Sequence, residues 1–200
     1  MIIGHPKDVA VRPVNRTPAR SVAVLLFALL IAVPVSAAAR MQPPDPPWIE
    51  QKTPTDCGRA VLASLAARRG GDPEAMYRRI PDPEDKTQGY SVAEMLRYGS
   101  RLGVKLVLEA PSGVTKAGFC APRQSNDDFL ARLRREITAG RPVIVPVAMD
   151  AARRHYLLLL ASGVNEFIAL DPASRGRRTL SSAELHTLMC GFAFIALIVR

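Results

Sequence analysis

Cys57 stands at the start of a run that is rich in alanine and leucine and has the pattern of an amphipathic helix. A cysteine in the first turn of a helix faces backbone N–H groups without intrahelical partners and the positive end of the helix dipole, and both stabilise a nucleophilic thiolate. Gln51, six residues upstream, can donate an amide hydrogen bond to the oxyanion that forms when a thiolate attacks a carbonyl. These two residues predict a nucleophilic site that still needs a base.

Histidine is the commonest general base, and the chain contains 3 histidines. His5 precedes a predicted leader segment, and His186 lies in a predicted short surface helix. His155 opens an apolar run, and the start of a buried strand would hold its ring rigidly. The next apolar run ends at Asp171, so a hairpin would bring its carboxylate beside His155. We therefore predict a triad in which Cys57 is the nucleophile, His155 the base and Asp171 the group that orients the base.

Each of these residues also has a purely structural interpretation. Cys57 alone fits a buried helical cysteine, His155 a hydrogen-bonded residue at a strand end, and Asp171 a turn residue. Asp56 fits the N-cap of the helix that begins at Cys57. The catalytic interpretation is favoured because one chain supplies a nucleophile, a base and an orienting carboxylate in suitable elements.

Around these residues the predicted elements change from helices to strands along the chain. Helical periodicity and capping patterns predict helices over residues 57–69, 72–79, 91–102, 126–138, where Asn126 would be the cap, and 182–189. Alternating apolar residues predict strands over residues 104–108, 143–149, 155–161, 167–170, 178–180 and 192–199. Helices followed mainly by strands indicate an α+β fold, with a cleft between an N-terminal helical lobe and an antiparallel sheet lobe.

In order and residue type, these features resemble the bacteriocin-processing cysteine peptidases, papain-like enzymes that cut leader peptides after a double glycine. The resemblance covers roughly residues 48–199 and rests on Gln51, Asp56-Cys57-Gly58, Gly140-Arg141-Pro142, His155-Tyr156 and Asp171-Pro172. It implies a papain-like fold and assigns the nucleophile, base, orienting and oxyanion roles to Cys57, His155, Asp171 and Gln51. Members of that family often have glycine before the histidine, where this chain has Arg154, and the transporter domains that commonly follow do not appear among these residues.

The resemblance leaves three functions open. The first is a cysteine-type endopeptidase that hydrolyses peptide bonds and processes leader peptides. The second is a catalytically degenerate domain that binds a peptide for an export system. The third is an amidase or a transferase that uses the same triad on a peptide or a cell-wall fragment.

Residues 1–39 have the pattern of a secretory signal peptide or an N-terminal membrane anchor. A basic region precedes an apolar core over residues 22–35, which is shorter than the roughly 20 residues that a spanning helix needs. We expect an exported protein, periplasmic or extracellular, that is either cleaved after Ala38 or Ala39 or tethered to the inner membrane by residues 21–39.

Residues 40–47 form a proline-rich tether in this interpretation, with Trp48 as its anchor on the domain. The resemblance implies one papain-like cysteine peptidase domain over residues 48–200. An apolar fraction of 48% and about 160 residues after the leader suffice for a single core.

Composition limits the partners. The net charge is +9, but the arginines are scattered over predicted helices without interleaved aromatics, so we expect a peptide or protein substrate, and an export system as a further partner, rather than nucleic acid. Arginines near His155 and after Asp171 would steer an anionic substrate segment. Cys120 and Cys190 either form a disulfide or stay separate in the core. The cysteine spacing gives no indication of zinc, and the predicted chemistry needs no metal or cofactor.

Overall fold

The computed structural model describes residues 45–111, 123–148, 154–174, 176–192 and 194–200, apart from the side chains of residues 123–125. Three helices come from the first half of the chain: α1 (Cys57–Ala67), α2 (Pro73–Arg78) and α3 (Val92–Arg101). Side chains cap two of them: the Asp72 carboxylate accepts the first N–H groups of α2, and Ser91 and Glu94 form a capping box on α3.

The second half of the chain builds a six-stranded sheet in which every neighbouring pair is antiparallel, in the order β1-β6-β2-β3-β4-β5. The strands are β1 (Leu106–Glu109), β2 (Val143–Ala148), β3 (Arg154–Ser162), β4 (Glu166–Asp171), β5 (Gly176–Ser181) and β6 (Ala196–Val199). β1 follows α3 directly in the chain and pairs with β6 at the edge of the sheet.

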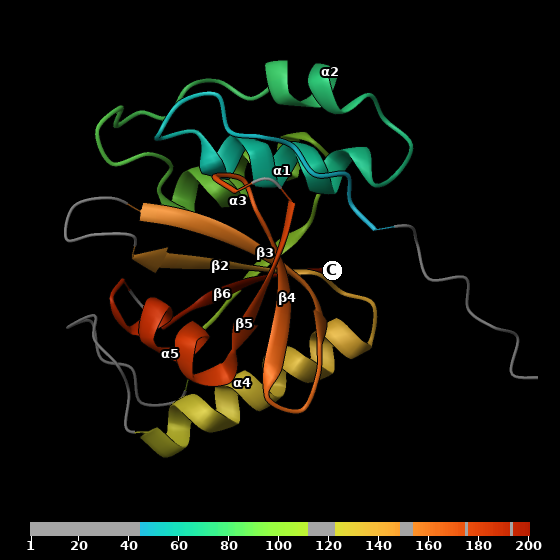
Figure 1. Cartoon of the computed structure of the whole chain (residues 1–200). Helices are drawn as coiled ribbons and strands as arrows, with labels where there is room; N and C mark the ends of the chain where they lie inside the picture. Colours follow the sequence, from blue (N-terminus) through green and yellow to red (C-terminus); the bar gives the residue numbers. More distant parts are fainter. Residues whose placement is uncertain (1–44, 112–122, 149–153, 175, 193) are drawn as a thin grey trace, which may run out of the picture. The chain divides into compact units, whose positions relative to one another are not determined.

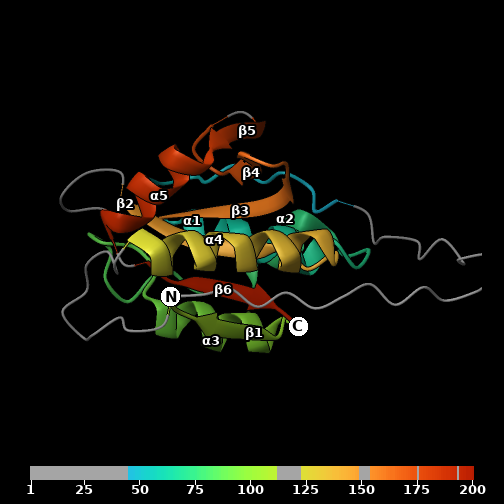
Figure 2. The same ribbon diagram turned by 90° about the horizontal axis from the view of Figure 1, so that it is seen from below.

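Alternate residues of the central strands face two separate cores. Tyr156 and Leu158 of β3 pack with the buried faces of α1, α2 and α3. Leu157 and Leu159 pack on the other side, with α4 (Arg123–Thr138) and α5 (Ser182–Cys190). Figure 1 shows α1–α3 above the sheet and α4 and α5 below it, and Figure 2 shows α4 lying across the lower face. The sheet is therefore the middle layer of three.

The predicted α+β class and the order of helices and strands are confirmed, and most boundaries lie within a few residues of the predicted ones. The final strand is shorter than predicted and begins at Ala196. The prediction that Asn126 caps the fourth helix is wrong, because α4 begins at Arg123 and Asn126 lies within its first turns. Asn126 is buried there, with its amide nitrogen 3.1 Å from Nε2 of His186 on α5, so a tertiary contact explains this polar residue.

The predicted leader and most of the tether lie outside the described residues. Within the described part of the chain, none of the helices combines the length and the apolar character needed to span a membrane.

Candidate active site

Cys57 is the first residue of α1 and is 1% exposed. At this position the backbone N–H groups of the first helical turn lack intrahelical acceptors, and the helix dipole has its positive end. The Sγ atom lies 3.8 Å from the carbonyl oxygen of Arg154, the first residue of β3. The start of α1 therefore meets the start of β3, although the two residues are far apart in the sequence.

Gly58 explains how α1 comes so close to its neighbours. A Cβ atom at this position would lie 2.8 Å from Sδ of Met95 on α3 and 2.9 Å from Cβ of Tyr90. Both contacts are too short for carbon, so a side chain at position 58 would force Met95, Tyr90 or α1 to shift. The glycine after the cysteine thus permits the close packing of the start of α1 against α3 and Tyr90.

His155 and Asp171 meet across β3 and β4, which form the predicted hairpin. The Nε2 atom of His155 lies 2.7 Å from Oδ1 of Asp171, and each residue is 3% exposed. The same Oδ1 accepts a hydrogen bond of 2.9 Å from the backbone N–H of Ala173, which fixes the carboxylate in the turn after β4. The Cys57 side chain also hydrogen-bonds with the His155 imidazole.

These contacts shift the pKa values of His155 and Asp171. Burial alone would lower the pKa of His155, but the hydrogen bonds to Asp171 and Cys57 and the charges of both groups raise it to about 9. Burial alone would raise the pKa of Asp171, but the hydrogen bond from His155, its charge, the Ala173 N–H and Arg178 together lower it. The site therefore favours a protonated imidazole beside the Asp171 carboxylate near neutral pH.

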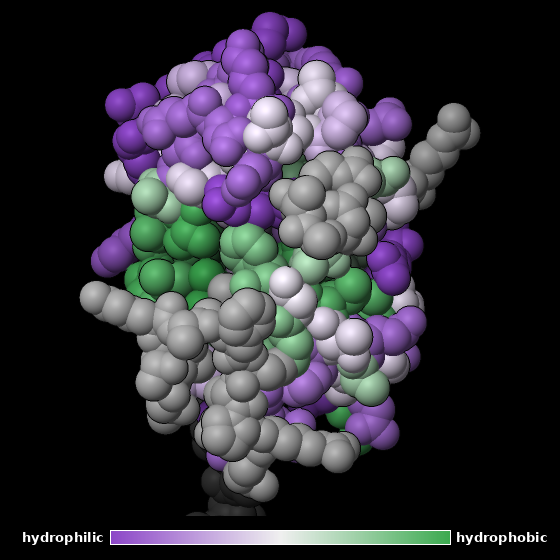
Figure 3. All heavy atoms as spheres, turned by 90° about the vertical axis from the view of Figure 1, so that its left-hand side faces the viewer, coloured by the Kyte–Doolittle hydropathy of each residue, from purple (hydrophilic) through white to green (hydrophobic). Residues whose placement is uncertain are grey.

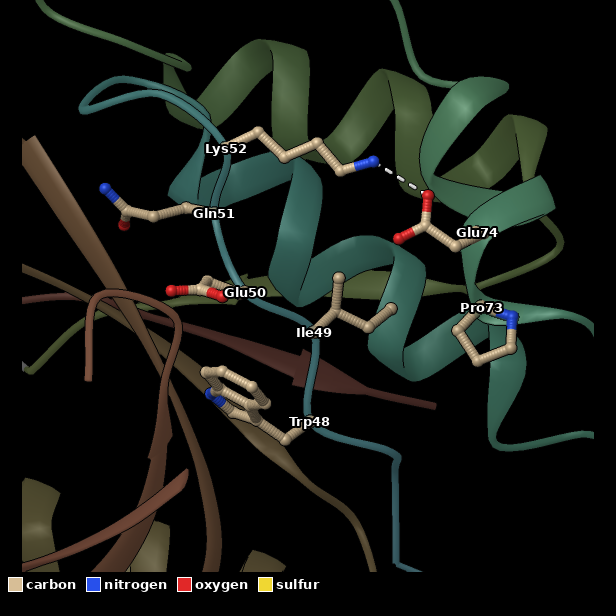
Figure 4. Close-up of a pocket in the computed structure, with 7 residues that line it drawn as sticks. All are labelled: Trp48, Ile49, Glu50, Gln51, Lys52, Pro73 and Glu74. Carbon is tan, nitrogen blue, oxygen red and sulfur yellow. Dashed lines mark hydrogen bonds and ion pairs between the residues drawn. The ribbon is translucent and has the colours of Figure 1, made fainter. Parts of the chain in front are cut away.

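Gln51 lies on the segment that precedes α1 and lines a cavity of about 640 Å³ together with Trp48, Ile49, Glu50, Lys52, Pro73 and Glu74. Its side chain points away from Pro73 and Glu74 (Figure 4). One N–H of its amide donates to the Thr53 carbonyl at 3.0 Å, and its Oε1 is buried without a hydrogen-bond partner. Because a side-chain amide carries two N–H groups, the second remains available as an oxyanion donor.

The segment from Trp48 to Gln51 is also bonded to the turn that carries Asp171. The indole N–H of Trp48 donates to the Asp171 carbonyl at 3.1 Å, and the Gln51 backbone N–H donates to the Pro172 carbonyl at 3.1 Å. Trp48 therefore holds the segment before α1 against the turn after β4. In addition, the Ser64 hydroxyl on α1 donates to the Pro47 carbonyl, so this segment contacts both the helical layer and the sheet.

Asp56 occupies the predicted N-cap position of α1, but its carboxylate does not cap the helix. The carboxylate turns back instead and accepts hydrogen bonds from the backbone N–H groups of Lys52 and Thr53 and from the hydroxyl of Tyr77 on α2. The prediction that the Asp56 side chain caps α1 is therefore wrong. Sequence reasoning missed Tyr77 because nothing local connects a tyrosine on α2 with the loop before α1.

The arginines near the site are less available to attract an anionic substrate segment than the sequence indicates. Arg177 forms an ion pair with Asp45. Nη1 of Arg178 lies 3.8 Å from Oδ2 of Asp171, so the charge of Arg178 acts on this carboxylate. The guanidinium of Arg154 lies 5.7 Å from the centre of the Phe192 ring. Arg153 and Arg175 lie outside the described residues.

Cys57 is a free thiol, whereas Cys190 is disulfide-bonded and Cys120 lies outside the described residues. His186 is a residue of α5, where it contacts Asn126 and the Phe194 ring. Across the described ranges, His, Cys, Asp and Glu side chains do not gather in groups of three or more that could hold a metal ion.

Figure 3 views the side of the molecule at which β2 ends and β3 begins. Apolar surface gathers there at the level of the sheet, below the polar surface of the helical layer. Apolar side chains of an extended ligand could be buried on this face.

No protein-family model matches the chain, and no curated protein matches it in sequence. Solved structures share its fold. The peptidase domain of Streptococcus ComA, a bi-functional ABC transporter involved in a quorum sensing pathway, is 20% identical with a TM-score of 0.53, over 76% of this chain and 96% of that one. A double glycine motif protease from an AMS/PCAT transporter, solved in complex with its leader peptide, is 16% identical with a TM-score of 0.53, over 81% and 96%.

A putative C39-like peptidase from Bacillus anthracis is 14% identical with a TM-score of 0.51, over 77% of this chain and 94% of that one. The chain therefore has the papain-like fold of these peptidase domains, and the predicted fold is confirmed.

Proposed function

We propose that the protein is a cysteine endopeptidase with Cys57 as the nucleophile, His155 as the general base and Asp171 as the group that orients His155. The observation that carries this proposal is the line of contacts from the Cys57 thiol through the His155 ring to the Asp171 carboxylate, with Nε2–Oδ1 at 2.7 Å. A buried imidazole between a thiol and a carboxylate is the arrangement that activates a cysteine for acyl transfer. The fold shared with three peptidase domains supports the same activity.

In this mechanism the thiol proton of Cys57 moves to His155, and the thiolate adds to the carbonyl carbon of the scissile bond. The electron pair of the C=O bond moves to oxygen, and the resulting oxyanion accepts hydrogen bonds from Gln51 and from a backbone N–H at the start of α1. Collapse of this intermediate breaks the C–N bond, and His155 donates its proton to the leaving amine. Water, deprotonated by His155, then hydrolyses the thioester and restores the free thiol.

The substrate class that we propose is a leader peptide cut after a double glycine. The double glycine motif protease with the same fold was solved with its leader peptide bound. The apolar surface beside the start of β3 offers contacts for the side chains of such a segment (Figure 3).

The test is hydrolysis of synthetic leader peptides by the full chain, followed by mass spectrometry. Cys57→Ala and His155→Ala should each abolish cleavage without loss of secondary structure, whereas His186→Gln, on the other side of the sheet, should cleave like the wild type. A matched peptide with Ala-Ala in place of Gly-Gly tests the cleavage motif. Full activity of either triad variant would refute the assignment. Binding of the peptide without cleavage would favour the degenerate binding domain, and an amide or transfer product would favour the amidase or the transferase.

We also propose that the protein acts outside the cytoplasm, in the periplasm or the extracellular space. Residues 1–39 have the pattern of a signal peptide or an anchor, and Cys190 is disulfide-bonded, a state that persists in oxidising compartments. Cell fractionation with N-terminal sequencing of the isolated protein would separate cleavage after Ala38 or Ala39 from an intact inner-membrane tether. Recovery of the whole chain in the cytoplasm would contradict the proposal.

A further inference from the structure

The loop over residues 51–56 joins the proposed oxyanion donor to the nucleophile, and its geometry depends on one buried carboxylate. Asp56 is 3% exposed. Its Oδ1 accepts the Thr53 N–H at 3.0 Å, its Oδ2 accepts the Lys52 N–H at 3.2 Å, and the Tyr77 hydroxyl also donates to Oδ2. A buried carboxylate is costly unless donors satisfy it, so these three hydrogen bonds strongly favour this one loop conformation.

Tyr77 connects the loop to α2. Its hydroxyl donates to Asp56 and also lies 3.3 Å from the Lys52 backbone nitrogen, so one hydroxyl group bridges the carboxylate and the loop. The ring is buried, and the cations of Lys52 and Arg59 lie 4.7 Å and 5.1 Å from its centre. The Lys52 side chain also forms an ion pair of 2.7 Å with Glu74 of α2, while the Gln51 side chain points the opposite way (Figure 4).

Two further contacts leave the loop little freedom. At its start, the Gln51 N–H donates to Pro172, the residue after Asp171. Near its end, the Thr55 carbonyl lies against Gly89, which has a φ of +79° and would place a Cβ atom only 2.8 Å from that oxygen. The loop is thus held at the Asp171 turn, at Gly89 and at Tyr77, and it continues directly into Cys57.

We propose that Asp56 and Tyr77 are positioning residues that hold the amide of Gln51 at the place where the oxyanion forms. The inference rests on the proposed function, because it concerns the oxyanion donor of that reaction. Neither residue touches the substrate. Asp56 is one peptide bond from Cys57, and its carboxylate fixes the two residues after Gln51, so it sets the donor and the nucleophile relative to each other.

Tyr77→Phe removes only the hydroxyl group and is the first variant to test, with Asp56→Asn as the second. Tyr98→Phe is the matched control, since Tyr98 is a buried tyrosine whose hydroxyl contacts Arg97 on α3 rather than the loop. Circular dichroism of the full chain checks folding. We expect Tyr77→Phe to lower kcat for a leader peptide about 10-fold, less than the loss of a whole donor, with KM little changed. Tyr98→Phe should retain wild-type kcat.

Two readouts separate positioning of the oxyanion donor from a general structural role. Alkylation of Cys57 by iodoacetamide forms no oxyanion, so its rate should stay within about twofold of the wild type in Tyr77→Phe. In addition, Tyr77→Phe should cause no further loss in a Gln51→Ala background, because the donor that it positions is already absent. Equal losses in both backgrounds, unchanged kcat in Tyr77→Phe, or a parallel loss of alkylation would each overturn the inference.

A peptide aldehyde keeps this test independent of turnover. The Cys57 thiolate adds to the aldehyde carbon, and the C=O electron pair moves to an oxygen at the oxyanion position, so affinity reports the Gln51 hydrogen bond. If the wild type fails to hydrolyse any leader peptide, the proposed function fails. The inference then stands if Tyr77→Phe weakens aldehyde binding only when Gln51 is present, and it is overturned if affinity is unchanged.

Discussion

Replacing Asp171 with asparagine should shift the protonation of His155 and, with it, the pH range of activity. Asparagine keeps the size of the side chain and a carbonyl oxygen for the Ala173 N–H, but it removes the negative charge 2.7 Å from Nε2 of His155. The hydrogen bond to Asp171 is the largest of the effects that raise the pKa of His155, ahead of the bond to Cys57. The variant therefore isolates the electrostatic part of the orienting role.

The size of the effect follows from the pKa of His155, which is about 9 compared with an ordinary value of 6.5. That difference corresponds to about 3 kcal/mol in favour of the imidazolium, and at pH 7.5 it means about 97% protonation instead of about 9%. If Asp171 supplies at least half of the effect, Asp171→Asn lowers the pKa of His155 by about 1 or more.

The assay is a pH titration of the histidine ring signals by ¹H–¹⁵N NMR in the wild type and the variant, with His186 as the internal control. His186 contacts Asn126 on the opposite side of the sheet, so its signals should not differ between the two proteins. The alkaline limb of kcat/KM should move to lower pH together with the His155 signal. A His155 pKa near 6.5 in the wild type, or an unchanged pKa in Asp171→Asn, would refute the reasoning.

Three further predictions use other contacts of the site. Because the pKa of His155 is higher in the folded protein than in the unfolded chain, its stabilising effect is complete below about pH 6.5 and disappears as pH rises through about 9; the difference in free energy of unfolding between the wild type and His155→Gln, measured by urea denaturation, should decrease over that interval. Gly58→Ala should cost about 1–3 kcal/mol of stability in the same assay and lower kcat, since a Cβ would contact Met95 at 2.8 Å; wild-type stability would show that α1 can move without cost. Trp48→Phe should lose about 1 kcal/mol with the hydrogen bond to the Asp171 carbonyl, and an unchanged urea midpoint would show that this anchor is unimportant.

Several parts of the site are predictable because their signals are local. Apolar periodicity of 2 and 3.6 residues locates the strands and helices, and a capping box of Ser91 and Glu94 begins the helix predicted over residues 91–102. The pairing of His155 with Asp171 is also accessible, because a hairpin places the ends of two successive strands side by side. Each of these features depends on residues that are close in the chain or adjacent in one sheet.

The two wrong cap predictions concern polar side chains that bond to residues of a different element. Asn126 and Asp56 have the residue types of helix caps, but Asn126 is buried against α5 and Asp56 turns back to the loop and to Tyr77. In both cases a tertiary partner competes with the local backbone for the same polar side chain, and burial makes the tertiary bond the stronger requirement.

The sequence by itself determined the α+β class and the order of the elements, and it singled out the cysteine, histidine and aspartate that we propose as the triad, because periodicity and residue chemistry are properties of the chain. Tertiary structure alone decided that α1 and β3 meet, that their contact with Asp171 raises the pKa of His155 to about 9, and that Tyr77 holds the loop before Cys57. Burial and charge at a site depend on every element packed around it, and packing between distant segments leaves no periodic trace in the sequence.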